Sequence, residues 1–224
     1  MRPEILDYLT QCRQIKTYAP GEIIFRQGEI PTELFYLISG LSLTYTVFED
    51  GRERNILMTW PGRLLGAATF FEVAPRRSSA IAIKPCEVIV IDTECYRQCC
   101  QRFPDFQEFV LRELSKDIGA LFEELADSSM LSADVRVARF LCRRLAEGQY
   151  SGTAEFPELH YSQEFLAQVI GISRISVSQV ISRFAELGWI STGYRKITIL
   201  NQSAIKTHAY DHVFEGVSLN ANCP

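Results

Sequence analysis

Two short segments with helical apolar spacing meet at a glycine between residues 162 and 190. In each segment, apolar residues recur at intervals of three and four, as on one face of an α-helix. Ser162 and Ser173 stand where helix N-caps are expected, and Gly171 supplies a permissive turn residue between the segments. The pattern predicts a helix-turn-helix. Its apolar positions are Phe165, Leu166, Val169, Ile170, Val177, Val180, Ile181 and Phe184.

The polar face of the second predicted helix carries hydroxyls, an amide and arginines instead of the Glu and Lys that are common on surface helices. Arg can pair with guanine and Gln with adenine through two hydrogen bonds each, and Ser can reach phosphates or base edges. We therefore predict that this helix reads the major groove of double-stranded DNA, although a helical hairpin used only for packing remains the alternative. The polar face comprises Arg174, Ser176, Ser178, Gln179, Ser182 and Arg183.

The residues after this helix predict a two-stranded wing. Leu187 to Ile190 should end the helix and enter a strand, residues 191–193 are polar turn material, and residues 196–200 alternate as a strand should. Lys196 is the wing residue expected to contact the DNA backbone, and Ser162 at the start of the first helix is also expected to contact DNA. We place this winged helix-turn-helix in a domain spanning residues 133–224.

Residues 18–92 read as a chain of short strands separated by turns, with no helix between them. One strand is expected to end at Gly40, the sequence Glu49-Asp50-Gly51 predicts a hairpin turn, and two final strands are expected around Lys84-Pro85. Closely spaced strands of this kind favour an antiparallel β-roll or jelly-roll barrel, which can enclose a ligand. The fold class is thus α+β.

Residues 94–132 change to a helical period. Apolar residues step by three and four, a heptad seam typical of a dimer interface or a spacer; packing on the chain's own sheet is the alternative. We predict a dimerisation helix over about 104–131 within an N-terminal domain of residues 1–132. Ser128, Ser129, Ser132 and Asp134 are expected to interrupt it as a hinge. The seam consists of Leu111, Leu114, Ile118, Leu121 and Leu125.

Composition supports two domains of ordinary size, since the chain has 224 residues and is 47% hydrophobic. No apolar run approaches the roughly 18 residues of a membrane span, and the N-terminus lacks the apolar core of a signal peptide, so we expect a cytoplasmic protein without membrane contact. Seven unevenly spaced cysteines fit reduced thiols. The net charge of −4 is uneven: residues 134–200 hold eight Lys/Arg against six Asp/Glu, so the predicted DNA surface can still be positive.

The order of these parts resembles the Crp/Fnr family of bacterial transcription regulators over roughly residues 15–200. The resemblance rests on PGEIIFRQGE, LFYLISG, GAATFFEVAPRRS, VRVARFL and GISRISVSQVISRF, in that order. It implies a homodimer on a pseudo-palindromic operator, a small effector in the N-terminal domain, and contact with RNA polymerase if the protein is an activator. The family reads its half-site with the first turn of the second helix, which here supplies Arg174, Ile175, Ser176, Ser178 and Gln179.

In cyclic-nucleotide-binding members, a phosphate cassette runs from a Gly-Glu pair to an Arg-Ser pair eleven residues after that Gly. Gly66, Arg77 and Ser78 fit that spacing, but Ala67 stands where the ribose-binding Glu is expected. The region of the long helix that contacts the base in those members is apolar here, at Leu121 and Phe122. These differences argue against cyclic AMP. They favour an anionic or aromatic effector that also contacts Phe70, unless Arg77 is simply an exposed loop residue.

Alternatives of other kinds remain open. The same fold could bind DNA without an effector, or respond to oxidants through Cys95, Cys99 and Cys100, although neighbouring helical cysteines more often fill a core. A metal site at His208, His212 and Cys223 is less expected than a solvated helix face, and we predict no metal. Common catalytic motifs are lacking, so we predict no catalytic residues and no enzymatic activity.

Overall fold

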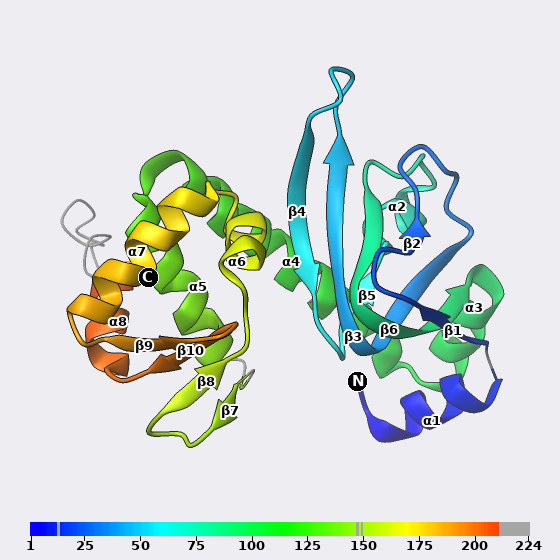
Figure 1. The fold of residues 1–224 in the computed structure, drawn as a ribbon. Helices are drawn as coiled ribbons and strands as arrows, with labels where there is room; N and C mark the ends of the chain where they lie inside the picture. The colour runs from blue at the N-terminus through cyan, green and yellow to red at the C-terminus, as the bar shows by residue number, and fades with distance from the viewer. Residues whose placement is uncertain (13, 147, 149, 211–224) are drawn as a thin grey trace, which may run out of the picture. The chain divides into compact units, whose positions relative to one another are not determined.

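The computed structural model describes residues 1–12, 14–146, 148 and 150–210. The chain divides into two compact units, one ending at Leu125 and the other beginning at Ala126 (Figure 1). Unit 1 combines an antiparallel sheet with helices, and unit 2 combines helices with a small sheet. The predicted α+β class is therefore confirmed.

Unit 1 is built on an antiparallel sheet of six strands in which β3 and β6 run side by side along their whole length (Figure 1). At one end of this pair, β5 joins β3 and β1 joins β6; at the other end, β4 joins β3 and β2 joins β6. This pairing gives a roll, and the described strands leave it open rather than closed into a barrel. The strands are β1 (Ile15–Tyr18), β2 (Ile23–Phe25), β3 (Glu33–Val47), β4 (Glu53–Thr59), β5 (Leu64–Leu65) and β6 (Ser79–Asp92).

Two strand ends predicted from the sequence are wrong. The chain passes through Gly40 within β3 and through Pro85 within β6, and the register of the two strands shifts at this point. Gly40 has φ 96°, and a Cβ there would lie 2.1 Å from the carbonyl oxygen of Pro85. The glycine and the proline therefore form one irregularity shared by two paired strands, which bends both without ending either.

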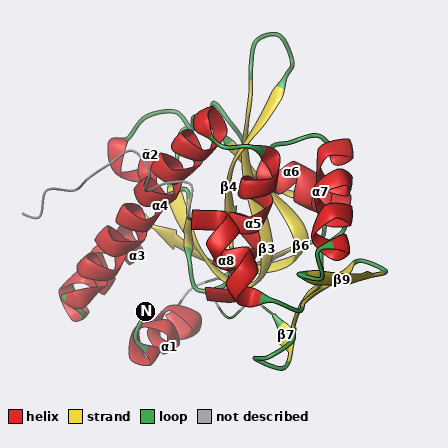
Figure 2. Ribbon diagram, turned by 90° about the vertical axis from the view of Figure 1, so that its left-hand side faces the viewer, coloured by secondary structure: helices red, strands yellow, loops and turns green. Residues whose placement is uncertain are grey.

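Helices cover one side of the sheet in unit 1 (Figure 2). Apolar side chains of α1, α3 and the first turns of α4 pack with those of β3 and β6 into one core cluster. The helix α1 was not predicted, and α2 contradicts the expectation that residues 18–92 contain no helix. The bounds are α1 (Pro3–Cys12), α2 (Ala67–Glu72), α3 (Thr93–Arg102) and α4 (Asp105–Met130).

The helix α4 agrees closely with the predicted dimerisation helix, but the predicted hinge is misplaced. Ser128 and Ser129 lie within α4, and the break falls at residues 131–132. Asp134 belongs to the first turn of α5 (Ala133–Ala146), where its carboxylate accepts a hydrogen bond from the Ser132 hydroxyl. Ser132 and Asp134 thus lie at the start of α5 and do not interrupt α4.

Unit 2 contains the predicted helix-turn-helix and a sheet larger than expected. Its four strands pair in the order β7-β8-β10-β9, so the wing hairpin of β9 and β10 is extended by β8 and β7. Residues 191–193, predicted as a turn, are part of β9, and the turn lies at residues 194–195. The remaining elements are β7 (Ser151–Gly152), β8 (Pro157–Leu159), α6 (Gln163–Ile170), α7 (Arg174–Glu186), β9 (Ile190–Gly193), β10 (Lys196–Ile199) and α8 (Gln202–Tyr210).

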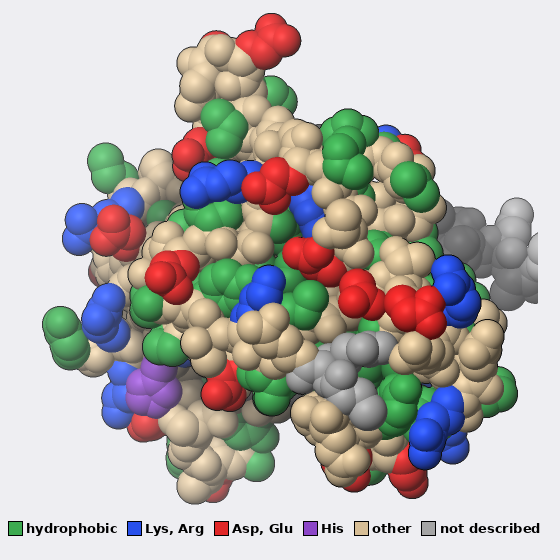
Figure 3. Space-filling view, turned by 90° about the vertical axis from the view of Figure 1, so that its right-hand side faces the viewer, with side chains coloured by type: hydrophobic (Ala, Val, Ile, Leu, Met, Phe, Trp, Pro, Cys, Tyr) green, Lys and Arg blue, Asp and Glu red, His purple; other side chains and the backbone are tan. Residues whose placement is uncertain are grey.

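Over the described residues, no single helix is both long and apolar enough to cross a membrane; α6 and α7 reach that length and composition only as a pair bent by 113°. The face shown in Figure 3 mixes acidic and basic side chains with apolar ones. The hairpin that joins β3 and β4 exposes Glu49 and Asp50.

Candidate DNA interface and effector site

The helices α6 and α7 meet in the geometry predicted from their caps. The hydroxyl of Ser162 accepts a hydrogen bond from the backbone N–H of Phe165 at 3.0 Å, and that of Ser173 accepts one from Ser176 at 3.0 Å. Gly171 has φ 68° and ends α6. The two helices are bent by 113° across the three residues that join them, within the range of helix-turn-helix motifs.

The buried and exposed faces of α7 are those expected from the sequence. Val177, Val180, Ile181 and Phe184 are buried. Arg174, Ile175 and Gln179 are exposed, and Ser176 and Ser178 are half-buried. Neither Arg174 nor Gln179 makes a hydrogen bond or ion pair with any part of the chain that the structure describes. Both side chains are thus free to bind another molecule.

Four of the other residues predicted to touch DNA have partners within unit 2. The Ser162 hydroxyl caps α6, and Ser176 lies 2.8 Å from Ser173, hydroxyl to hydroxyl. Arg183 forms an ion pair of 2.8 Å with Asp134, and Lys196 forms one of 2.9 Å with Glu158. These side chains would have to share or exchange their partners in order to bind a phosphate.

Asp134 connects three helices of unit 2. Its carboxylate lies 2.8 Å from Arg183 of α7 and 3.1 Å from Nε2 of His208 of α8. Burial alone would raise the pKa of Asp134, but hydrogen bonds from Ser132 and from its own backbone N–H, with the nearby charges of Arg183 and His208, lower it to about 2. The sequence gives little indication of this role, because an Asp at the start of a helix is common and its partners Arg183 and His208 lie far away along the chain.

We expect the variant Asp134→Asn to be less stable than the wild type by about 1 to 2 kcal/mol at pH 7. Since the folded pKa lies below the ordinary value of 3.8, this stabilisation is present above pH 3.8 and lost as the pH falls through about 2. Urea unfolding between pH 2 and 7 measures the difference. Asp50→Asn, in an exposed ion pair with Arg52, is the control and should change little; equal effects of the two variants would refute the role of Asp134.

Residues of the predicted effector site gather around α2. Gly66 precedes this helix with φ 73°, and Ala67 and Phe70 are buried in the core cluster shared with α1, α3 and α4. The ring of Phe70 contacts Phe71 at 5.1 Å and Tyr96 at 6.2 Å between centroids. Gly66, Ala67 and Phe70 thus lie close together in a largely apolar setting.

Of the two adjacent arginines in this region, Arg77 lies at the surface and Arg76 is buried. Arg77 is exposed and forms an ion pair with Glu72, and Ser78 after it is half-buried. Arg76, which was not predicted as a site residue, is only 4% exposed. Both arginines lie in the irregular segment between α2 and β6, where Arg76 turns inward and Arg77 outward. The spacing of the family cassette pointed to Arg77, and only the packing shows that the inward position belongs to Arg76.

Arg76 is held by neutral groups. Its guanidinium stacks 4.0 Å from the ring centroid of Phe25 and donates to the backbone carbonyl oxygens of Glu33 at 2.6 Å and Gly66 at 3.4 Å. A Cβ on Gly66 would lie 2.4 Å from this guanidinium, so the contact requires glycine. Burial lowers the pKa of Arg76, while Glu33 and Glu29 raise it less. Within the described residues, Arg76 forms no ion pair.

The apolar residues of α4 lie in two kinds of surroundings. Phe106 and Val110 are buried in the core of unit 1, and Leu114 is half-buried against it. Phe109 is likewise half-buried, whereas five apolar residues further along α4 are exposed, with Leu111 at 64% and Phe122 at 68%. The exposed apolar residues of this helix, which we call the α4 seam, are Leu111, Ile118, Leu121, Phe122 and Leu125.

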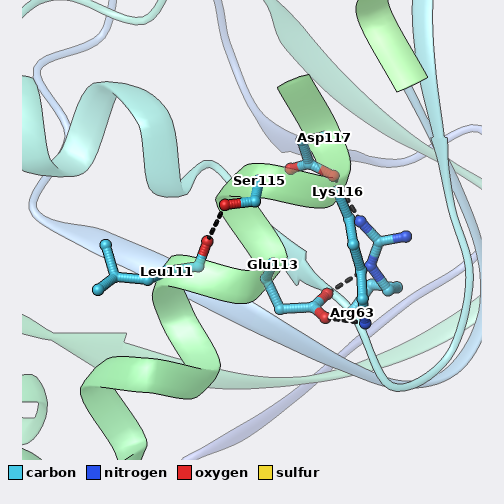
Figure 4. A network of polar contacts seen from close by, with 6 residues as sticks. All are labelled: Arg63, Leu111, Glu113, Ser115, Lys116 and Asp117. Atoms are coloured by element: carbon cyan, nitrogen blue, oxygen red, sulfur yellow. Dashed lines mark hydrogen bonds and ion pairs between the residues drawn. The ribbon is translucent and has the colours of Figure 1, made fainter. Parts of the chain in front are cut away.

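A polar network attaches the loop before β5 to α4 (Figure 4). Arg63 forms an ion pair with the buried carboxylate of Glu113 and another of 2.7 Å with Asp117. Lys116 lies 2.7 Å from the second oxygen of Glu113. Burial and the charge of Glu113 raise the pKa of Asp117 to about 6, although Arg63 and Lys116 oppose the rise. The network therefore contains one carboxylate, that of Asp117, whose pKa of about 6 lies close to neutral pH.

We expect Asp117→Asn to change how stability depends on pH. Because the folded pKa exceeds the ordinary value of 3.8, protonation stabilises the wild type fully below about pH 4, and this stabilisation is lost as the pH rises through about 6. The variant should lack this loss, so its stability relative to the wild type rises by about 1 to 2 kcal/mol between pH 4 and 7. Chemical denaturation at several pH values measures it; parallel curves for both proteins would contradict the assignment.

The described thiols are mostly buried. Cys95 and Cys99 are fully buried in the core cluster of unit 1, and burial raises the pKa of Cys86 and of Cys142. His208 is not on a solvated helix face as expected, because it packs 5.3 Å from the ring of Trp189 and binds Asp134. His212 and Cys223 lie outside the described residues. These surroundings are those of core residues rather than of reactive groups.

Two family models match the chain in the order of its units. A cyclic nucleotide-binding domain matches residues 15–103, and a Crp-like helix-turn-helix domain matches residues 135–207. Among curated proteins, the "CRP-like cAMP-activated global transcriptional regulator" of Mycobacterium tuberculosis is 28% identical over 213 residues, which are 93% of this chain and 94% of that protein. The "Cyclic AMP receptor protein" of Thermus thermophilus is 26% identical over 210 residues, 94% of each chain.

Solved structures show the same fold. TTHA1359, a CRP/FNR family transcriptional regulator from Thermus thermophilus, has a TM-score of 0.72 at 20% identity, with 88% of this chain and 98% of that chain covered. OCPA-complexed CprK has a TM-score of 0.70 at 18% identity, with 91% of this chain and 94% of that chain covered. Along the chain, the unit that carries α6 and α7 therefore follows a unit that matches a cyclic nucleotide-binding domain.

Proposed function

Because this chain belongs to the Crp/Fnr family of transcription regulators, we propose that it is a cytoplasmic homodimer that binds a pseudo-palindromic operator and is controlled by a small effector. The observation that carries this proposal is the pair Arg174 and Gln179, exposed and uncommitted on the first turns of α7. These side chains can each form two hydrogen bonds to a base edge. We propose a regulatory role and no catalytic one.

We propose a separate function for each of the two matched domains. Residues 1–132 bind the effector and dimerise, and residues 133–224 bind DNA. The α4 seam supports dimerisation. Its apolar side chains are exposed in the single chain, and their burial against a second copy would lower the free energy of the system. In such a dimer the two α7 helices would face half-sites about 34 Å apart. If the protein is an activator, RNA polymerase is its further partner.

We propose that the effector is anionic or aromatic and is not cyclic AMP. The relatives named above as cAMP-activated differ from this chain at about three residues in four, and the family's ribose-binding Glu is replaced here by the buried Ala67. The guanidinium of Arg76 supports an anionic ligand, because this buried charge stacks on Phe25 and donates to backbone carbonyl oxygens but forms no ion pair within the described residues. Phe70 and Leu121 would suit an aromatic part of the ligand.

Selection of duplexes from a random pool tests the DNA proposal. The wild-type protein should enrich an inverted repeat, and the selected duplex should bind more tightly than a scrambled one by about 10³-fold or more. A gel-shift titration at fixed salt measures both constants, because affinities without a stated salt concentration cannot be compared. Enrichment of no sequence would overturn the proposal.

Calorimetric titration tests the effector proposal. The probes are cyclic AMP, cyclic di-GMP and a chlorinated hydroxyphenylacetate, each against the wild type, Arg76→Met and Arg77→Met. We expect binding of an anionic probe other than cyclic AMP that is abolished in Arg76→Met and retained in Arg77→Met. Circular dichroism of both variants confirms that they fold. Tight binding of cyclic AMP would refute the proposed effector class while leaving the DNA proposal intact.

A further inference from the structure

Asp117 belongs to the polar network of α4 and also borders the α4 seam (Figure 4). It directly precedes Ile118, which lies in the middle of the seam, and Leu111 and Ile118 are seven residues apart. A spacing of seven keeps residues on one line of a helix pair, and the position just before that line is one of the two that flank the contact between the helices. Asp117 occupies this flanking position. A change in its charge can therefore act on the network of unit 1 and on a second copy of the chain.

Charged groups face Asp117 from its own helix and from the loop before β5. Arg63 of the loop lies 2.7 Å from the Asp117 carboxylate, but it also pairs with Glu113, whose side chain is 3% exposed. Lys116 pairs with Glu113 at 2.7 Å and is itself 59% exposed, so water screens its charge. Burial and then the charge of Glu113 raise the pKa of Tyr36 of β3, the titratable group that faces the network from the sheet. Asp117 thus depends on one cation that it shares with a second carboxylate.

We propose that Asp117 links dimerisation to pH, in that a second copy covers the α4 seam most tightly when this carboxyl group is protonated. Water reaches 27% of the Asp117 side chain in the single chain. Covering the seam would remove part of that water, and loss of water disfavours the charged form of a carboxyl group. The opposite flank of the seam at this level carries the ring of Phe122, so a parallel second copy brings an apolar group to Asp117 rather than a cation. The inference rests on the dimer of the proposed function.

The direction of the effect follows from the protons that each state binds. In the single chain, burial has already raised the pKa of Asp117 to about 6, and further burial against a second copy raises it again. The dimer therefore binds more protons than two separate subunits do. Dimerisation accordingly weakens as the pH rises through about 6 and above. Because a dimer is needed to reach both half-sites, operator binding should also be tighter in mild acid.

Sedimentation of the fluorescently labelled full chain at nanomolar concentrations, at several pH values from about 5 to 8 and at fixed ionic strength, tests this inference. We expect the dissociation constant of the wild-type dimer to rise about tenfold or more over this range, because each of the two copies of Asp117 adds its own effect. Asp117→Asn keeps the shape of the side chain without a titrating proton, so its dissociation constant should stay level. Circular dichroism confirms that the variant folds.

Two further variants complete the test. Asp117→Glu keeps a titrating carboxyl group at this position and should keep a rise with pH. Asp105→Asn removes a carboxylate of the same helix that pairs with Arg2 outside the seam, and it should keep the full rise of the wild type. A wild-type dimer whose dissociation constant is independent of pH, or a rise that persists in Asp117→Asn, would overturn this inference alone. A wild-type protein that is monomeric at every pH and concentration overturns the proposed dimer, and this inference with it.

Discussion

The variant Ile118→Glu is expected to be a folded monomer under conditions where the wild type is a dimer. Ile118 lies in the middle of the α4 seam and is 54% exposed in the single chain, so its replacement leaves the core of unit 1 intact. In a symmetric dimer the substitution acts twice. Each copy loses about 2 kcal/mol of apolar burial and gains an unpaired charge in the interface. Dimerisation should therefore weaken by about 10³-fold or more.

Sedimentation and light scattering measure this result directly. Binding of the selected duplex should weaken by at least about 100-fold, because a monomer reaches only one half-site. Ile30→Glu is the matched control, since Ile30 is 63% exposed but lies outside the seam. A dimeric Ile118→Glu protein, or equal effects of both variants, would show that α4 is not the dimer interface.

The second large effect concerns sequence preference. Arg174→Ala should lower the ratio of selected to scrambled binding by about 10²-fold or more, because one arginine bound to a base edge is worth about 1 to 3 kcal/mol and the substitution acts in both subunits of a dimer. Gln179→Ala should relax preference at a different base pair. Both residues are exposed and lack partners in the described chain, so neither change should reduce the stability of the fold.

Competition binding with duplexes that differ at one base pair of each half-site identifies the position that each residue reads. Lys206→Ala, which removes an exposed cation of α8, serves as the control for the loss of one positive charge. If Arg174→Ala weakens binding to all duplexes alike, Arg174 contacts phosphate and our assignment of it to direct readout is wrong.

The helix-turn-helix could be predicted from the sequence because its signals are local. The caps Ser162 and Ser173, the turn at Gly171 and the buried face of α7 all involve residues within a few positions of one another. The order of the two domains and the extent of α4 followed from changes in apolar period for the same reason. Hydrogen bonds and periodic burial within one helix need no information from the rest of the chain.

Features that depend on distant residues could not be predicted. The continuity of β3 and β6 through Gly40 and Pro85 is decided by their pairing, which joins segments far apart in the sequence. Strand ends were therefore misplaced where a glycine or a proline marks a bend shared by two strands. Likewise, the shift of the Asp117 pKa arises from burial and from charges on a separate loop.

The sequence by itself determined the two domains, their order, and which residues of α7 face away from the protein core. The tertiary structure alone decided which of two adjacent arginines is buried, and which cations of unit 2 are already paired. Those choices depend on the packing of Phe25 and Glu33 around Arg76 and of Asp134 against Arg183. A side chain's identity states what it can bind, but only its neighbours in space determine whether it is free to do so.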